Sequence, residues 1–173
     1  MTGQTVQNQG ATRTRPALAA PIAALLVSLI GLSACGTLGP GVVTESGGVT
    51  RSALGYMNQA RQANGVAPAA PDARLEQAAL EQARYMASAG RMTHTTRLGR
   101  DFVSRKNANR IDGAAAENVA VDYGNPDIGR IMKMWMASPG HRRNMLNPAY
   151  SHFGVASAAD DKGRHYWAMV LAK

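Results

Sequence analysis

The chain has 173 residues, and its 19 lysines and arginines exceed its 11 aspartates and glutamates to give a formal net charge of +8 at pH 7. Without residues 1–34, 139 residues remain, enough for one domain and too few for two ordinary ones, with 17 basic against 11 acidic residues. The basic residues are spread along the chain, which favours a solvated surface without a specific partner. Anionic lipid head groups or wall polymers are the alternative partners. Nucleic acid is disfavoured as a partner if the protein is exported, as the start of the chain indicates.

Residues 1–34 have the order of a signal peptide. Arg13 and Arg15 come first, an apolar run from Ala17 to Leu32 follows, small residues end the segment, and no acidic residue occurs in it. The run is shorter than the roughly 20 residues of a spanning helix, and Pro21 interrupts it. We therefore expect an exported protein and not a permanent membrane helix.

Leu32-Ser33-Ala34-Cys35 resembles the lipobox of bacterial lipoproteins, in which the cysteine becomes the lipidated first residue. Cys35 is the only cysteine, so no internal disulfide can form, and a lone free thiol is unusual in an oxidising compartment. The resemblance predicts a lipoprotein that is anchored to a membrane through Cys35 and faces the periplasm or the cell exterior. An ordinary signal sequence with an incidental cysteine is the alternative, and the choice between inner and outer membrane stays open.

Residues 35–48 are rich in glycine and lack apolar periodicity, which indicates a flexible tether before a domain over residues 49–173. Helical spacing of apolar residues then predicts a helix from Thr50 that ends at Asn64-Gly65. A second helix is expected between a capping Asp72 and Gly90.

The second half of the chain alternates helical and strand patterns. A weak helical pattern covers residues 97–109, and residues 114–121 indicate a short strand. Asn125-Pro126 is typical of a helix start, and an apolar stripe that includes Trp135 follows it and indicates core packing. Two strands, 151–159 and 165–172, are joined by a hairpin loop that contains Gly163.

The last predicted strand decides the fold class. Tyr166, Ala168 and Val170 point to one side, whereas Trp167, Met169 and Leu171 point to the other. A strand that is apolar on both faces is normally covered on both faces. We therefore predict an α+β fold, a three-layer α-β-α sandwich around a small, mainly antiparallel sheet.

A proline-induced helix break makes His141 the first candidate site residue. The helix should end near Ser138, because the residue before Pro139 is disfavoured in helical geometry. Ser138 can then cap a new turn whose exposed N–H groups disfavour a protonated His141. A neutral imidazole suits a metal site or a general base, although a histidine that only hydrogen-bonds across the turn has the same spacing.

Two further residues have weaker signals. His94 lies in a loop just past Gly90, where a surface histidine is the alternative interpretation. Glu117 interrupts an otherwise apolar strand, and a carboxylate there needs a partner. His152 and His165 lie on strand candidates and compete for any site.

Several short stretches, taken together and in order, carry a resemblance to a known family. They are Met57-Asn58-Gln59-Ala60-Arg61, Met92-Thr93-His94, Glu117-Asn118-Val119-Ala120, Trp135-Met136-Ala137-Ser138-Pro139-Gly140-His141-Arg142, Asn144-Met145-Leu146, Phe153-Gly154-Val155 and Tyr166-Trp167. With these stretches, residues 49–173 resemble the CAP superfamily of cysteine-rich secretory proteins, insect venom antigen 5 and plant pathogenesis-related proteins, and are most similar to its bacterial members.

The resemblance implies an α-β-α sandwich with a cleft lined by two histidines and two acids. By motif match these are His94, His141 and Glu117, and the histidines would hold zinc or another divalent cation. The second acid falls on Ser138, which weakens any case for catalysis by paired carboxylates. The disulfides of animal and plant members are absent.

Three functions remain open, because a fold does not determine a reaction. The favoured one is a non-enzymatic domain that binds a lipid or a wall fragment in or beside the cleft. The alternatives are a metal-dependent hydrolase of peptides or wall polymers, with Glu117 as general base, and a scaffold of the cell envelope. The oligomeric state stays open.

Overall fold

The computed structural model describes residues 41–95 and 101–173, which belong to one compact unit, Gly36–Lys173. The elements in chain order are β1 (Val43–Gly48), α1 (Thr50–Gln62), β2 (Ala70–Pro71), α2 (Ala73–Ala89), α3 (Phe102–Ala108), β3 (Ala115–Tyr123), α4 (Ile128–Ala137), α5 (Pro139–Met145), β4 (His152–Asp160) and β5 (Arg164–Ala172). The predicted signal peptide and Cys35 lie outside the described residues. None of the described helices is long and apolar enough to cross a membrane.

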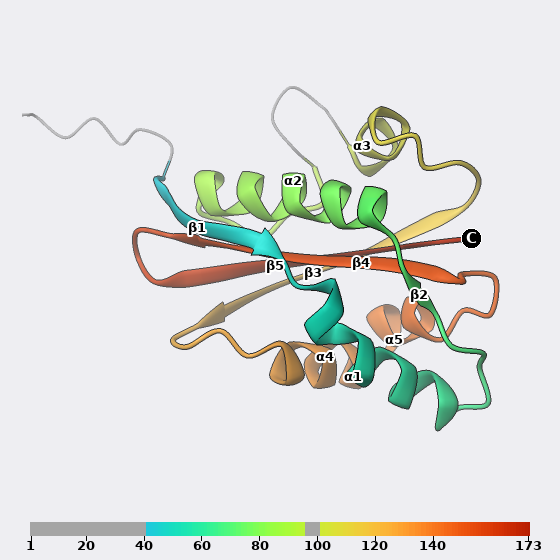
Figure 1. Cartoon of the computed structure of the whole chain (residues 1–173). Coiled ribbons are helices and arrows are strands. Elements are labelled where there is room, and N and C mark those ends of the chain that lie inside the picture. The colour runs from blue at the N-terminus through green and yellow to red at the C-terminus, as the bar shows by residue number, and fades with distance from the viewer. Residues whose placement is uncertain (1–40, 96–100) are drawn as a thin grey trace, which may run out of the picture. The chain divides into compact units, whose positions relative to one another are not determined.

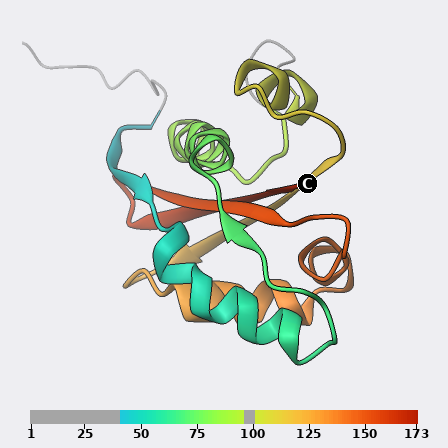
Figure 2. The same cartoon turned by 45° about the vertical axis from the view of Figure 1, so that its right-hand side comes forward.

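The strands form one sheet in the order β1-β4-β5-β3, with antiparallel neighbours, while the short β2 pairs in parallel with the start of β4. Helix α2 packs on one face of this sheet, and α1, α4 and α5 cover the other (Figures 1 and 2). The predicted α+β sandwich is therefore confirmed.

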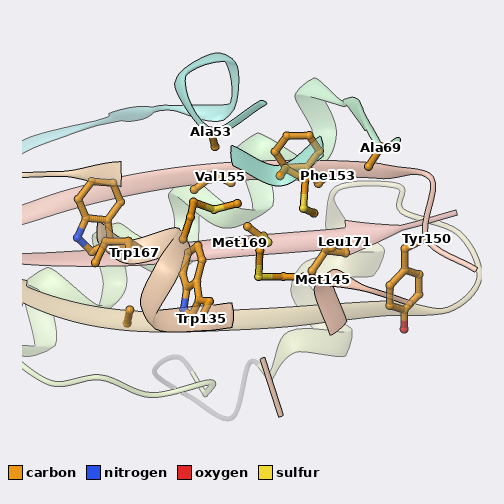
Figure 3. Close-up of a cluster of buried hydrophobic side chains, with 14 residues drawn as sticks. Ala53, Ala69, Trp135, Met145, Tyr150, Phe153, Val155, Trp167, Met169 and Leu171 are labelled. Carbon is orange, nitrogen blue, oxygen red and sulfur yellow. The ribbon is translucent and has the colours of Figure 1, made fainter. Parts of the chain in front are cut away.

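Strand β5 has two buried faces, as its sequence predicts, and they contribute to two separate cores. Trp167, Met169 and Leu171 pack against Trp135 of α4 and Met145 of α5 (Figure 3). The alternate residues of β5, among them Tyr166 and Ala168, pack in the second core under α2. Both described cores and the described sheet lie within Gly36–Lys173, which forms a compact unit by itself.

Helix α2 lies very close to β4 because both surfaces are small. Ala78, Ala79 and Ala83 are fully buried on the inner side of the helix. At Gly154 of β4 an added Cβ would lie 2.0 Å from the backbone nitrogen of Glu76, so the helix backbone rests directly on the strand. Asp72 caps α2, accepting the N–H groups of Arg74 and Leu75, as predicted.

The prediction of a tether through residue 48 is wrong for residues 43–48. They form β1, which pairs with Ala156 to Asp160 of β4. A strand at the edge of a sheet is held by backbone hydrogen bonds, so it does not need the apolar alternation on which the prediction relied.

Two helix starts also differ from the predictions. Asp127, not Asn125, caps α4, and its carboxylate accepts the N–H groups of Gly129 and Arg130. Asp101 caps α3, so the described helix begins at Phe102, whereas residues 96–100 lie outside the described residues.

Candidate functional site

Glu117 is the centre of a polar cluster at the start of β3. Its side chain is 2% exposed, and it accepts hydrogen bonds from two partners on separate segments. Arg105 of α3, also buried, donates to Oε2, and Nδ1 of His94 lies 2.9 Å from Oε1. These partners compensate the burial of a charge in an apolar strand.

The loop that carries His94 is fixed by two buried side chains. Gln82 of α2 donates a hydrogen bond to the carbonyl of Thr93, and Arg105 donates to the carbonyl of His94 at 3.3 Å. The His94 side chain is nevertheless 57% exposed. Because Nδ1 faces Glu117, Nε2 is the ring nitrogen that Glu117 leaves available.

His141 lies in α5, immediately after the predicted helix break. Helix α4 ends at Ala137, Ser138 has extended backbone geometry, and Pro139 begins α5. Ser138 precedes the helix as predicted, but its side chain makes no capping hydrogen bond.

An asparagine pair fastens α5 to β3 beside Glu117. Asn118 is fully buried and donates to the carbonyl of His141 at 3.1 Å. Asn144 of α5 in turn donates to the side-chain oxygen of Asn118 at 2.8 Å. His141 is therefore positioned through its own backbone by the neighbour of Glu117 in sequence.

The two histidines have opposite electrostatic environments. The hydrogen bond to Glu117 raises the pKa of His94 above its ordinary value of 6.5. Burial lowers the pKa of His141, and the positive charge of His94 lowers it further. The predicted preference of His141 for the neutral form is right in direction, but burial and not the helix end is the main cause.

A pocket of about 230 Å³ opens beside this cluster. Ser138 and His141 provide its polar end, and the remaining lining is apolar: Met92, Val119, Ala120, Val121, Met134 and Trp135. His94 and Glu117 do not line it. Of the predicted cleft residues, His141 and Ser138 therefore line this pocket, whereas His94 and Glu117 form a hydrogen-bonded pair outside its lining.

The residues present fit a closed metal site poorly. Among the described residues, no group of three histidine, cysteine or acidic side chains could hold a metal ion. Two ring nitrogens remain, while both oxygens of Glu117 are engaged by Arg105 and His94. The other two histidines that the sequence offered for this site have different neighbours. His152 forms a hydrogen bond with the hydroxyl of Ser151 at 2.9 Å, and His165 is opposite Asp122 in the β3–β5 register.

Sequence reasoning missed Arg105, Gln82, Asn118 and Asn144 as parts of the site. Arg105 falls in the helix with the poorest pattern, and Gln82 belongs to a stripe that indicates core packing. Asn118, inside the matching stretch Glu117-Asn118-Val119-Ala120, and Asn144, inside Asn144-Met145-Leu146, had a signal in the sequence through the family resemblance.

The model of the cysteine-rich secretory protein (CAP) family matches residues 54–171. The chain belongs to this family. Its only cysteine, Cys35, lies outside the matched region, so this CAP domain contains no disulfide. A curated relative, the uncharacterized protein YkwD of Bacillus subtilis, is 32% identical over 99 residues, which are 57% of this chain and 38% of that protein.

Solved structures have the same fold at low identity. An outer surface protein of Borrelia burgdorferi is 17% identical with a TM-score of 0.65, over 77% of this chain and 98% of that one. An extracellular SCP-domain protein of Bacillus anthracis is 19% identical with a TM-score of 0.58, over 71% of this chain and 40% of that one. A cysteine-rich secretory protein of Staphylococcus aureus is 21% identical with a TM-score of 0.54, over 70% and 36%.

Proposed function

We propose that this CAP domain is the non-enzymatic binding domain of an exported lipoprotein anchored through Cys35, and that it holds a lipid or a wall-derived ligand. The observation that supports this function most directly is the apolar pocket beside the polar cluster. An apolar hollow with a few polar groups at one end is the usual form of a small-molecule site.

The size and rim of the pocket restrict the ligand. An apolar cavity of about 150 Å³ accommodates benzene, so about 230 Å³ accepts one ring or a short aliphatic segment of a larger molecule. Met92 and Met134 are 51% and 43% exposed. Methionine side chains adapt to varied apolar shapes, which suits a ligand that extends beyond the pocket.

The environment of Glu117 favours binding over hydrolysis. A general base must be free to accept a proton, whereas Arg105 and His94 already occupy both oxygens of Glu117. Ser138 replaces the second acid, and catalytic zinc sites ordinarily use three protein ligands. We therefore propose that zinc or another divalent ion binds only weakly, through His94 and His141.

The deciding experiment is lipid extraction and mass spectrometry of the protein purified from its host. Met134→Asp places a charge at the pocket and should abolish recovery of the ligand. Val103→Asp is the matched control, because Val103 is 56% exposed on α3 and does not line the pocket. A ligand retained by the Met134 variant, or none in any sample, would contradict the proposal.

A parallel assay separates the remaining functions. Turnover of wall peptides with added zinc, abolished by Glu117→Gln, would establish the hydrolase instead. Absence of both ligand and turnover would leave the scaffold.

A further inference from the structure

Helices α1, α4 and α5 contain no acidic residue within their bounds, and Asp127 caps the start of α4. Its basic residues are Arg51, Arg61, Arg130, Lys133, Arg142 and Arg143. Helix α2 on the opposite face has two arginines and two glutamates, so its charges balance. Six basic residues from separate stretches of the sequence thus lie in the helices that cover one side of the sheet.

Not all of these cations are available to a partner. Arg61 is buried and donates to backbone carbonyls that include those of Met145 and Tyr150. Arg130 pairs with Asp122. Four exposed cations remain without a carboxylate partner among the described residues: Arg51, Lys133, Arg142 and Arg143.

Two of these cations line a wide, open pocket on the side of α5. Its volume is about 610 Å³, and its lining is Pro139, Arg142, Arg143, Leu146, Asn147 and Pro148. The guanidinium of Arg142 also donates to the side-chain oxygen of Asn64 at 2.9 Å. Two arginines together with Pro139, Leu146 and Pro148 suit an anionic group attached to an apolar body. This pocket is separate from the one that His141 and Ser138 line.

The same layer exposes an aromatic side chain. Tyr56 of α1 is 42% exposed and packs over Gly129 of α4, where a Cβ would lie 2.8 Å from its hydroxyl. Tyrosine is favoured where an apolar phase meets water. A purely ionic polymer offers charge alone, whereas a phospholipid surface offers phosphate together with apolar contact.

We propose that the outer face of α1, α4 and α5 docks on a membrane through anionic phospholipid head groups, with the pocket of Arg142 and Arg143 receiving a head-group phosphate. This contact goes beyond the proposed ligand pocket and does not require it. It would bring the domain against the bilayer whether or not Cys35 carries a lipid.

The test uses Gly36–Lys173 and vesicles of phosphatidylcholine with or without phosphatidylglycerol. The domain should sediment only with the anionic vesicles, and added salt should release it, because charges are screened beyond about 8 Å at physiological ionic strength. Each cation near such a surface contributes about fivefold in affinity, so Arg142→Gln with Arg143→Gln should weaken binding about 25-fold. Arg51→Gln with Lys133→Gln provides an independent second variant.

Arg84→Gln with Lys162→Gln is the control, because it removes two exposed cations outside the three helices. Far-UV circular dichroism verifies that every variant is folded. Equal binding to neutral vesicles would overturn the proposal. So would an equal loss in the control, or capture of soluble polyphosphate without capture of anionic vesicles. Failure to recover a pocket ligand by mass spectrometry would affect only the proposed function.

Discussion

Replacement of Gly154 by alanine tests the packing that positions the site. An alanine Cβ would lie 2.0 Å from the nitrogen and 2.5 Å from the Cα of Glu76, and 2.3 Å from the carbonyl carbon of Leu75. Real Cβ atoms essentially never approach closer than 3.0 Å, so α2 and β4 must separate by about 1 Å. All three atoms are backbone, so no rotamer change relieves the clash, and we expect about 3 kcal/mol of destabilisation, the upper part of the overpacking range.

Urea unfolding of Gly36–Lys173 measures this difference. Gly55→Ala is the matched control, because Gly55 lies in α1 with nothing within 4 Å of the added Cβ. Alanine exceeds glycine in helix propensity, so this variant should gain up to about 1 kcal/mol. If Gly154→Ala were as stable as the wild type, α2 could not rest on the backbone of β4. The inference that this packing holds Gln82 against the His94 loop would then be wrong.

Two further variants test the polar cluster. Arg105→Met should destabilise the fold by about 3 kcal/mol in urea unfolding, because it leaves Glu117 buried without its main partner. Adding Glu117→Leu to this variant should recover most of the lost stability. If the two substitutions instead caused additive losses of stability, Arg105 and Glu117 would not act as a pair. In NMR titrations His94 should have a pKa above 6.5 that falls in Glu117→Gln. The pKa of His94 is raised in the folded state, so the stability from its contact with Glu117 is complete below the unfolded pKa and disappears as pH rises through the folded pKa. A titration of His94 that is unchanged in Glu117→Gln would refute the contact.

The layers of this fold were predictable because they depend on short-range patterns. The alternation along Trp167, Met169 and Leu171 sets the two faces of β5, and the spacing around Trp135 sets the inner side of α4. Strand β1 was missed because its residues are held by backbone pairing to β4, which side-chain periodicity does not report.

The site was predictable only in part. Glu117 was predicted to need a partner because burying a carboxylate in an apolar strand costs free energy. The sequence could not reveal that this partner is Arg105. That pairing depends on how α3 docks beside β3, and the register of two distant elements is a tertiary property. For the same reason the sequence could not reveal that His141 lines the apolar pocket while His94 pairs with Glu117 outside its lining.

The role of α5 follows from its shortness. The break at Ser138-Pro139 separates seven residues from the apolar stripe of α4, so this segment need not bury a full helical face. It is fixed instead by the contact of Asn118 with the carbonyl of His141 and by Arg61 at its far end. Those contacts use backbone carbonyls. The side chain of His141 lines one pocket, the side chains of Arg142 and Arg143 line another, and Arg142 also donates to the side-chain oxygen of Asn64 at 2.9 Å. An interrupted helix thereby allows one short segment to contribute to two separate pockets.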